Sequence, residues 1–387
     1  MNHKVTLVIS GHLDSYFINS LGLNDMIEQV ATQVVSKYIK KGNMARCLRD
    51  ILPSSGLSKE QRETVAEIVH NVVRWKKLYD HILDTRAAEP NPRLYVKLAV
   101  EGAEAEASRF PFEYHYSCSS YVAGVLKDYG DWAGYLNETP PTTLCVNFNR
   151  SSPEQVMNLL HEEQIFAERS VLGTALLTTS VSKYSGVLQQ RFAHVQDENS
   201  QFIAHLAASY GESIFDFCAG NGGKSLAMAS LSRNAKQLVA YDTNAAKRTI
   251  LAKRCGDYGA HVKVEDTISS KVFDVVLVDA PCTGLGAARR NPEAKYIEDS
   301  DDFPSTQLSI LEQAAGNVRD HGYLLYSVCT ITPEETTQVI QEFVKRTDFS
   351  VAPFTSRYSK FLQATKHGAF TVLPRGDLFF LSLLHKQ

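Results

Sequence analysis

The spacing of apolar residues changes along the chain, and the change predicts differently built regions. From about residue 24 to residue 136, apolar residues recur every three or four positions, as in amphipathic helices. Ser58 stands before Glu60 and Gln61 at the start of one such stretch, a pattern typical of a helix N-cap. From residue 211 onward, short apolar runs alternate with helical patterns, which indicates a doubly wound parallel sheet. We therefore expect an all-α domain at 23–138 and an α/β domain at 196–387.

A third, smaller region is expected between these two. Pro140 and Pro141 indicate a linker, and residues 142–195 then show the patterns of a strand, a capped helix and, over 166–179, further strand. This order predicts a small α+β subdomain with a βαβ-like unit. Residues 1–22 are weakly patterned, and we expect a short strand or a loose arm there.

Two apolar runs end on groups that can perform chemistry. Residues 273–286 read FDVVLVDAPCTGLG, the pattern of a strand buried on both faces, and Asp279 and Cys282 follow its apolar core. Residues 322–330 read GYLLYSVCT and end near Cys329, before Pro333, which is expected to open a helix. Ligands of doubly wound sheets bind at the carboxyl ends of the strands. A carboxylate and two thiols are therefore predicted at one such edge.

Composition excludes several protein classes. The chain has 387 residues, a net charge of −3, 44% hydrophobic and 21% charged residues, values typical of a soluble globular protein. No apolar run approaches the length of a membrane helix. The seven cysteines show neither a disulfide framework nor paired zinc-ligand spacing. We expect a cytoplasmic protein without a membrane span or a metal, and a monomer.

Basic residues gather locally in the helical region. Residues 37–77 contain ten lysines and arginines against four acidic residues, and Arg74, Lys76 and Lys77 lie at the end of this segment. Such an excess forms either solvated helix faces or a surface for a polyanion, and the sequence leaves both interpretations open.

A glycine-rich loop, DFCAGNGGKS, follows the first strand of the α/β region. Gly220, Gly222 and Gly223 permit a tight turn and close backbone approach at a helix N-terminus, where a negative group is favoured. Asp242 ends the next strand twenty residues after Gly222, where an acid accepts hydrogen bonds from ribose hydroxyls. Asp266 ends the third strand in a matching position. A nucleoside-containing cofactor and a purely structural glycine turn both fit these residues.

Two thiols beside a carboxylate suit one difficult reaction. Carbon 5 of a cytosine becomes nucleophilic after a thiolate adds to ring carbon 6 while an acid supports ring nitrogen 3. A base then removes the carbon 5 proton and the thiol leaves. Taken singly, each cysteine is better interpreted as a small buried hydrophobe. The pairing of Cys282 and Cys329 at neighbouring strand ends, with Asp279, favours function, and nearby Lys224 could ionise a thiol.

The motifs DFCAGNGGKS, DAPCTGLGAARRNP and YSVCTITPEET, with Asp242 and the segment QDENSQ, together resemble the RsmB/Sun family of RNA cytosine-C5 methyltransferases. The helical region is similar to the NusB-like RNA-binding domain of bacterial members. The resemblance implies a Rossmann-like methyltransferase domain that uses S-adenosylmethionine and acts on RNA, most directly small-subunit (16S) ribosomal RNA. It assigns Cys329 as nucleophile, Cys282 to product release, Asp279 to the target cytosine and Lys224 to support of the site.

The resemblance also implies a cofactor site and RNA contacts. The cofactor residues are Cys218, Ala219, Gly220, Gly222, Gly223, Lys224, Asp242, Asp266 and Asp279. Arg289 and Arg290 match a basic pair, for which we expect phosphate contacts, as for Arg74, Lys76 and Lys77. The family's usual Ala-Pro appears here as Gly220-Asn221, which leaves the loop geometry open. The alternatives are a tRNA or DNA cytosine methyltransferase, the latter with Cys282 as nucleophile, or a non-catalytic RNA-binding assembly factor.

Overall fold

The computed structural model describes residues 24–355 and 357–387, so the arm expected at 1–22 lies outside the described residues. The chain divides into two compact units. One contains the residues up to Asn137 together with Lys295–Glu298, and the other contains Glu138–Ala294 and Asp299–Gln387. Each unit is built around its own hydrophobic core.

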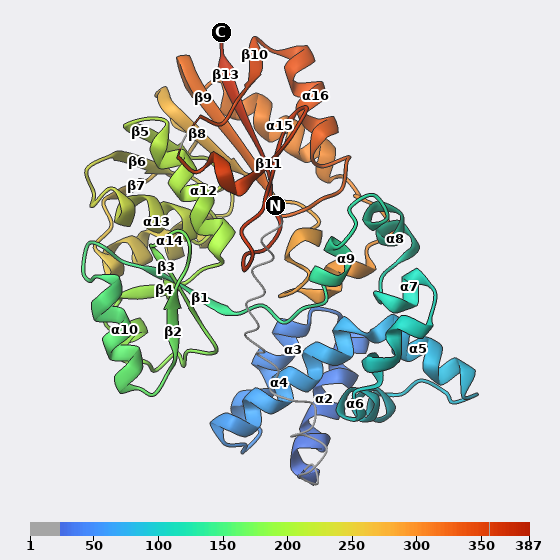
Figure 1. Cartoon of the computed structure of the whole chain (residues 1–387). Helices are drawn as coiled ribbons and strands as arrows, with labels where there is room; N and C mark the ends of the chain where they lie inside the picture. The colour runs from blue at the N-terminus through green and yellow to red at the C-terminus, as the bar shows by residue number, and fades with distance from the viewer. Residues whose placement is uncertain (1–23, 356) are drawn as a thin grey trace, which may run out of the picture. The chain divides into compact units, whose positions relative to one another are not determined.

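The first unit is all-α, as its sequence pattern predicts (Figure 1). In α4, the buried residues Val65, Ile68, Val69 and Val72 follow the three- and four-residue spacing of a helix face. The N-cap prediction for Ser58 is confirmed, because its hydroxyl accepts from the Gln61 amide in a capping box. The described helices of this unit are α2 Asp25–Lys41, α3 Met44–Ile51, α4 Lys59–Arg74, α5 Lys76–Thr85, α6 Pro92–Glu101, α7 Phe112–His115, α8 Ser120–Leu126 and α9 Trp132–Tyr135.

A segment distant in sequence completes the helical unit. Lys295 is only 1% exposed, and its ammonium donates to the carbonyls of Arg74 at 2.7 Å and Tyr116 at 3.0 Å, and to the side chain of Asn137. The Tyr296 hydroxyl donates to the Val73 carbonyl at 2.7 Å. Burial lowers the pKa of Lys295 well below its ordinary value. These hydrogen bonds satisfy a charged group in the interior, and nothing in the apolar spacing predicts them.

The small subdomain at the start of the second unit contains a split βαβ unit. Its strands β1 Thr142–Val146, β2 Ala167–Arg169, β3 Ala175–Thr178 and β4 Ala193–Val195 form a sheet in the order β2-β3-β1-β4. β3 is antiparallel to both β1 and β2, so β1 and β2 run parallel with β3 between them. The single strand expected over 166–179 is therefore a hairpin. Helices α10 Pro153–Glu162 and α11 Gly186–Gln189 belong to this subdomain.

The remainder of the second unit is the expected doubly wound fold. Within the described residues, nine strands form one sheet in the order β11-β12-β13-β9-β8-β5-β6-β7, with β10 beside β13. Strands β5 to β9 pair in parallel, whereas β13 is antiparallel to β9. The strands are β5 Ser213–Asp216, β6 Gln237–Ala240, β7 Val262–Val264, β8 Phe273–Asp279, β9 Val318–Val328, β10 Phe349–Ala352, β11 Leu362–Thr365, β12 Gly368–Thr371 and β13 Phe380–Lys386.

Helices cover both faces of this sheet (Figure 1). The chain runs from β5 outward to β7 on one side and then from β8 outward to β9 on the other. Right-handed crossovers in opposite directions place their helices on opposite faces. The strand order reverses between β5 and β8, and such a switch point is where doubly wound sheets bind ligands. The helices are α12 Glu198–Ser209, α13 Gly223–Leu231, α14 Ala245–Tyr258, α15 Phe303–Ala315 and α16 Thr337–Arg346.

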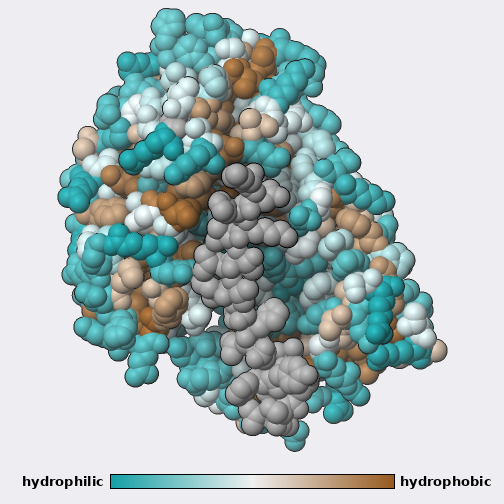
Figure 2. Space-filling view, in the orientation of Figure 1, coloured by the Kyte–Doolittle hydropathy of each residue, from teal (hydrophilic) through white to brown (hydrophobic). Residues whose placement is uncertain are grey.

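One helix boundary differs from the prediction. α16 begins at Thr337 and not at Pro333, so residues 333–336 form a turn between Cys329 and the helix. Figure 2 shows hydrophilic residues over most of the visible face, with hydrophobic residues in smaller patches. In the described part of the chain, none of the helices combines the length and the apolar character that a bilayer crossing requires.

Candidate active site

The two thiols predicted at strand ends lie side by side. β8 and β9 pair in parallel with Asp279 opposite Ser327, so Cys282 and Cys329 both follow the carboxyl ends of neighbouring strands. Their Sγ atoms are 3.3 Å apart. Exposure separates this pair from most of the other cysteines, because Cys282 and Cys329 are partly exposed whereas Cys47, Cys118, Cys145 and Cys255 are buried. The pair therefore does not behave as ordinary core cysteines.

Asp279 lies between a cation and a hydroxyl. The Lys224 ammonium donates to Asp279 Oδ2 at 2.5 Å, and the Ser327 hydroxyl donates to Oδ1 at 2.5 Å. Lys224 is only 9% exposed. Burial alone would lower the pKa of Lys224, but the Asp279 carboxylate raises it overall, and the sulfur of Cys329 adds to this effect. A charged lysine thus stands next to both the acid and one thiol.

The electrostatic surroundings of the two thiols differ. The hydrogen bond with Cys329, burial and the Glu335 carboxylate together raise the pKa of Cys282 well above its ordinary value. Cys329 interacts instead with the Lys224 ammonium. A thiolate is the reactive form of cysteine, so its raised pKa makes Cys282 poorly suited to act as a nucleophile.

The glycine loop between β5 and α13 has an exceptional backbone. Gly222 has φ +85°, a backbone conformation that L side chains rarely adopt, so glycine is favoured there. Gly222 is also the N-cap of α13 and provides no side chain to its first turn. The N-terminal amides of this helix are consequently available to a ligand.

Of the two acids predicted at the cofactor site, Asp242 contacts this loop, and Asp266 pairs with an arginine of α14. Asp242 accepts from the Gly220 amide at 2.9 Å and from the Asn244 amide at 2.9 Å, one on each oxygen. Each oxygen keeps a lone pair for a further donor such as a ribose hydroxyl. Asp266 lies 3.5 Å from Arg248, with its side chain 94% exposed.

The backbone of the loop is open on one side at Gly220. A Cβ placed at Gly220 would meet no atom within 4 Å, so the backbone here faces open space. The adjacent cysteine, Cys218, is no second nucleophile, because burial raises its pKa. The acids, the free helix amides and this space fit a nucleoside-containing cofactor. Among the described residues, no three His, Cys, Asp or Glu side chains converge in a way that could hold a metal ion.

Arg289 and Arg290, expected at phosphates, have internal partners. Arg289 is 2% exposed and donates to the Gly376 carbonyl at 3.4 Å. Arg290 forms ion pairs of 3.0 Å with Asp197 and 3.1 Å with Asp377. Asp197 also caps α12, so Arg290 connects the QDENSQ segment to the ARRNP segment. We therefore assign both arginines to internal contacts of the fold and do not propose them as phosphate ligands.

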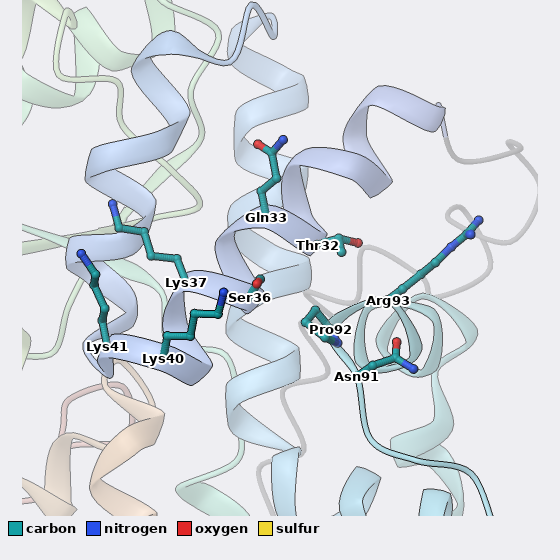
Figure 3. Close-up of a pocket in the computed structure, with 9 residues that line it drawn as sticks. All are labelled: Thr32, Gln33, Ser36, Lys37, Lys40, Lys41, Asn91, Pro92 and Arg93. Carbon is teal, nitrogen blue, oxygen red and sulfur yellow. The ribbon is translucent and has the colours of Figure 1, made fainter.

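Some basic residues of the helical unit are buried or form ion pairs, and others are exposed. Arg74 is 3% exposed, Lys76 pairs with Asp80 at 2.7 Å, and Lys77 pairs with Glu113 at 2.7 Å. Lys40 and Lys41, at the end of α2, are exposed. They line a hollow of about 620 Å³ to which Lys37 and, from the start of α6, Arg93 also belong (Figure 3).

Sequence reasoning missed three contributors to the site. Ser327 stands two residues before Cys329, and the parallel register that brings it to Asp279 was its only signal. Glu335 was interpreted as an acid in the first turn of a helix, but it lies in the turn before α16 and contacts Thr283. Gln307 on α15 donates to the Pro281 carbonyl at 2.9 Å, and no motif marks it.

Comparison with known proteins agrees with this geometry. Residues 203–385 match the family model of 16S rRNA methyltransferase RsmB/F. A probable ribosomal RNA small subunit methyltransferase B of Bacillus subtilis is 30% identical over 251 residues, which cover 59% of this chain and 56% of that protein. The chain thus spans little more than half the length of this curated relative.

Solved structures share the fold. The crystal structure of PH0851 superposes with a TM-score of 0.78 at 21% identity and covers 95% of this chain and 100% of that one. The structure of NSun6 from Pyrococcus horikoshii with SFG has a TM-score of 0.60 at 15% identity and covers 69% of this chain and 98% of that one. At these identities the likeness shows the architecture alone. Residues 203–385 thus match the model of the RsmB/F methyltransferase family, which the motifs of the sequence also resemble.

Proposed function

We propose that this protein transfers a methyl group from S-adenosylmethionine to carbon 5 of a cytosine in RNA, through a covalent bond between Cys329 and ring carbon 6. The observation that carries the proposal is the 3.3 Å approach of two partly exposed thiols beside the Lys224–Asp279 pair. Methyl transfer by deprotonation alone needs no thiol, whereas attack at an unreactive ring carbon needs a covalent nucleophile.

The residues divide the reaction between them. The Cys329 thiolate adds to carbon 6, and the electron pair displaced from the ring makes carbon 5 nucleophilic. When bound, the cofactor supplies an electrophilic methyl group. A base then takes the carbon 5 proton, and the electron pair of that C–H bond re-forms the double bond between carbons 5 and 6. The bond between carbon 6 and Cys329 breaks in the same step, and Cys329 leaves as a thiolate. Cys282 is placed beside that bond by its sulfur contact, which suits a role in product release.

Asp279 and Lys224 orient the base and the nucleophile. One oxygen of Asp279 is held by Lys224 and the other by Ser327, and the carboxylate retains lone pairs for the polar edge of the base. The Lys224 ammonium also interacts electrostatically with Cys329. Carbon 6 is reachable only in a base that has left its stack, so an RNA loop or single strand is the expected substrate.

Ribosomal RNA of the small subunit is the proposed target, because the matching family model and curated relative carry that name. The exposed lysines of α2 would contribute phosphate contacts. This assignment is tested by bisulfite sequencing of ribosomal and transfer RNA from cells with and without the protein. A cytosine that loses protection only in transfer RNA would redirect the substrate assignment.

The covalent step is tested with two single substitutions. Cys329→Ala is expected to abolish methyl transfer, since the neighbouring thiol, Cys282, has a raised pKa and is a poor nucleophile. Cys282→Ala is expected to accumulate a protein–RNA adduct that survives denaturing gels, because addition still proceeds while release fails. Cys255→Ala, a buried cysteine outside the site, is the matched control and should do neither. An adduct that requires Cys282 would reverse the two roles.

A further inference from the structure

Glu335 is a buried carboxylate that touches both cysteine-bearing loops. It is 0% exposed and lies in the turn that follows Cys329. Its Oε2 accepts from the Thr283 amide at 2.9 Å, and its Oε1 accepts from the Thr283 hydroxyl at 2.5 Å. Thr283 directly follows Cys282. One side chain on the Cys329 side thus binds the Cys282 loop through two separate hydrogen bonds.

Further hydrogen bonds complete the cluster. Glu335 Oε1 accepts from the Thr332 hydroxyl at 2.8 Å and from the Thr330 hydroxyl at 3.3 Å, and Oε2 accepts from the Gln307 amide at 3.0 Å. Thr330 directly follows Cys329, and its hydroxyl lies 2.9 Å from that of Thr283. Each cysteine is therefore followed by a threonine, and the two threonines meet at one carboxylate.

The free-energy cost of burying the Glu335 carboxyl group indicates a role beyond stability. Burying a charge is costly unless it is paired and hydrogen-bonded, and the donors named here are all neutral. Well-packed apolar residues would hold two loops together at lower cost. The Glu335 carboxyl group, unlike an apolar side chain, binds donors of both loops in a fixed geometry.

We propose that Glu335 is a positioning residue that holds the Cys282 loop against the Cys329 loop and sets the surroundings of the Cys282 thiol. The catalytic consequence, two sulfurs with different tasks, rests on the proposed methyltransferase function. The structural part of the proposal stands on the hydrogen bonds alone.

The groups around Cys282 show where the charge acts. Besides Glu335, Cys282 faces the Cys329 thiol, the Gly284 amide and the Tyr326 hydroxyl. Of these, only the Gly284 amide lowers the pKa of Cys282. The Tyr326 hydroxyl donates to the Glu335 carbonyl at 2.8 Å, so it belongs to the same cluster. Without the carboxylate, Cys282 would ionise more readily and compete with Cys329 as nucleophile.

The first test measures thiol ionisation in the full-length protein without RNA. The rate of alkylation by iodoacetamide is followed against pH for Cys282 and Cys329 separately, by peptide mass spectrometry. In Glu335→Gln, the pH of half-maximal rate for Cys282 should fall by about one unit, because a nearby negative charge has gone. Glu334→Gln, the neighbouring acid, is the control and should leave the profile unchanged. A folded Glu335→Gln protein with the wild-type Cys282 profile would overturn the proposal.

The second test measures how closely the loops are held. Diamide takes two electrons and two protons from a pair of thiols, and the resulting Cys282–Cys329 disulfide is counted by mass spectrometry. Thr283→Val removes one hydroxyl donor but keeps the buried charge, and it serves if Glu335→Gln does not fold. Cross-linking should slow by roughly fivefold in Thr283→Val, because one of the two hydrogen bonds that Thr283 makes to Glu335 is lost. An unchanged rate would contradict the positioning role.

Failure of the two proposals can be told apart. Neither thiol assay requires methyl transfer, so an inactive wild-type protein would refute the proposed function while Glu335 remained testable. If methyl transfer is observed, Glu335→Gln should lower kcat and change its pH profile while KM for RNA stays near the wild-type value. A rise in KM alone would indicate an RNA contact and refute the positioning role.

Discussion

At the scale of single residues, the site depends on carboxyl groups whose surroundings differ. Asp279 receives a cation and a hydroxyl, whereas Asp216, at the end of β5, is 1% exposed and accepts from Ser225 at 2.5 Å. Burial, with smaller contributions from Asp279 and Asp242, raises the pKa of Asp216 to about 7. Asp216 therefore differs from an exposed carboxyl group, because it still holds its proton well above the pH at which such a group ionises.

The raised pKa of Asp216 predicts how the stability of the fold depends on pH. Its folded pKa of about 7 lies above the ordinary value of 3.8, so the folded chain binds the extra proton between these values. Stability from this group is thus present at low pH and is lost as pH rises toward 7. Asp216→Asn removes the effect, so the free energy of unfolding of the variant, relative to wild type, should increase between pH 5 and pH 8. Urea denaturation at both pH values measures it, and a relative stability independent of pH would contradict the assignment.

At the scale of elements, the Cys282 loop is held by its neighbours rather than by its own sequence. The Gly286 amide donates to the Cys329 carbonyl at 2.9 Å, and the Leu378 amide donates to the Gly286 carbonyl at 3.0 Å. A Cβ on Gly286 would lie 2.1 Å from the Leu378 carbonyl oxygen. The loop therefore passes between β9 and the residues before β13, and glycine is needed there for close approach rather than for a positive φ.

Gly286→Ala should consequently weaken both the fold and the site. Backbone atoms cannot move aside as a flexible side chain can, so we expect a loss of about 1–3 kcal/mol in the free energy of unfolding, with reduced methyl transfer. Gly256→Ala, on α14, is the matched control, since a Cβ there meets no atom within 4 Å and alanine favours a helix. Thermal denaturation of both variants checks this, and equal melting temperatures would refute the close-approach argument.

At the scale of the whole molecule, the sequence of the second unit is interrupted by a short segment that belongs to the helical unit. Lys295–Glu298 belong to the helical unit although the residues on either side belong to the other unit. Only twelve residues separate Cys282 from Lys295, so the chain that carries the thiol continues directly into the helical unit. The buried Lys295 and Tyr296 make this segment an integral part of that unit.

The exposed lysines of the helical unit allow a prediction about RNA affinity. In the double variant Lys40→Glu with Lys41→Glu, two exposed cations beside the α2 hollow become anions. RNA binding at moderate salt should weaken by roughly tenfold or more, and the dependence of affinity on salt should become shallower, because fewer counterions are released. Lys59→Glu, at the N-terminus of α4, is a control that the helix dipole tolerates. Filter binding at several salt concentrations distinguishes the outcomes, and an unchanged salt slope would exclude this surface.

Much of this architecture could be predicted because local sequence patterns determine which segments form helices and which form strands. The change in apolar spacing predicted the helical and doubly wound parts, and the buried runs that end near Cys282 and Cys329 predicted neighbouring strand ends. Boundaries were less certain, since Pro333 opens a turn and not α16. Residues 166–179 form a hairpin because Gly173, with a positive φ, lies in the turn between the two strands.

The partners of charged residues could not be predicted. Arg290 pairs with Asp197 and Asp377, some ninety residues away on either side, and was expected at a phosphate. Glu335 follows Pro333, which was expected to open a helix, and it is buried against Thr283 in a turn. The sequence around a charged residue does not show whether its partner is a distant side chain, a ligand or water.

By itself, the sequence determined where strands end, which residues bear chemistry there and which family they resemble, because periodicity and short motifs are local properties of the chain. Only the tertiary structure decided that the two thiols lie 3.3 Å apart and that Glu335 binds both loops. It also decided that Lys224 donates a hydrogen bond to Asp279 and interacts electrostatically with Cys329. These relations depend on the parallel register of β8 and β9, which hydrogen bonds between strands establish and which no local pattern encodes.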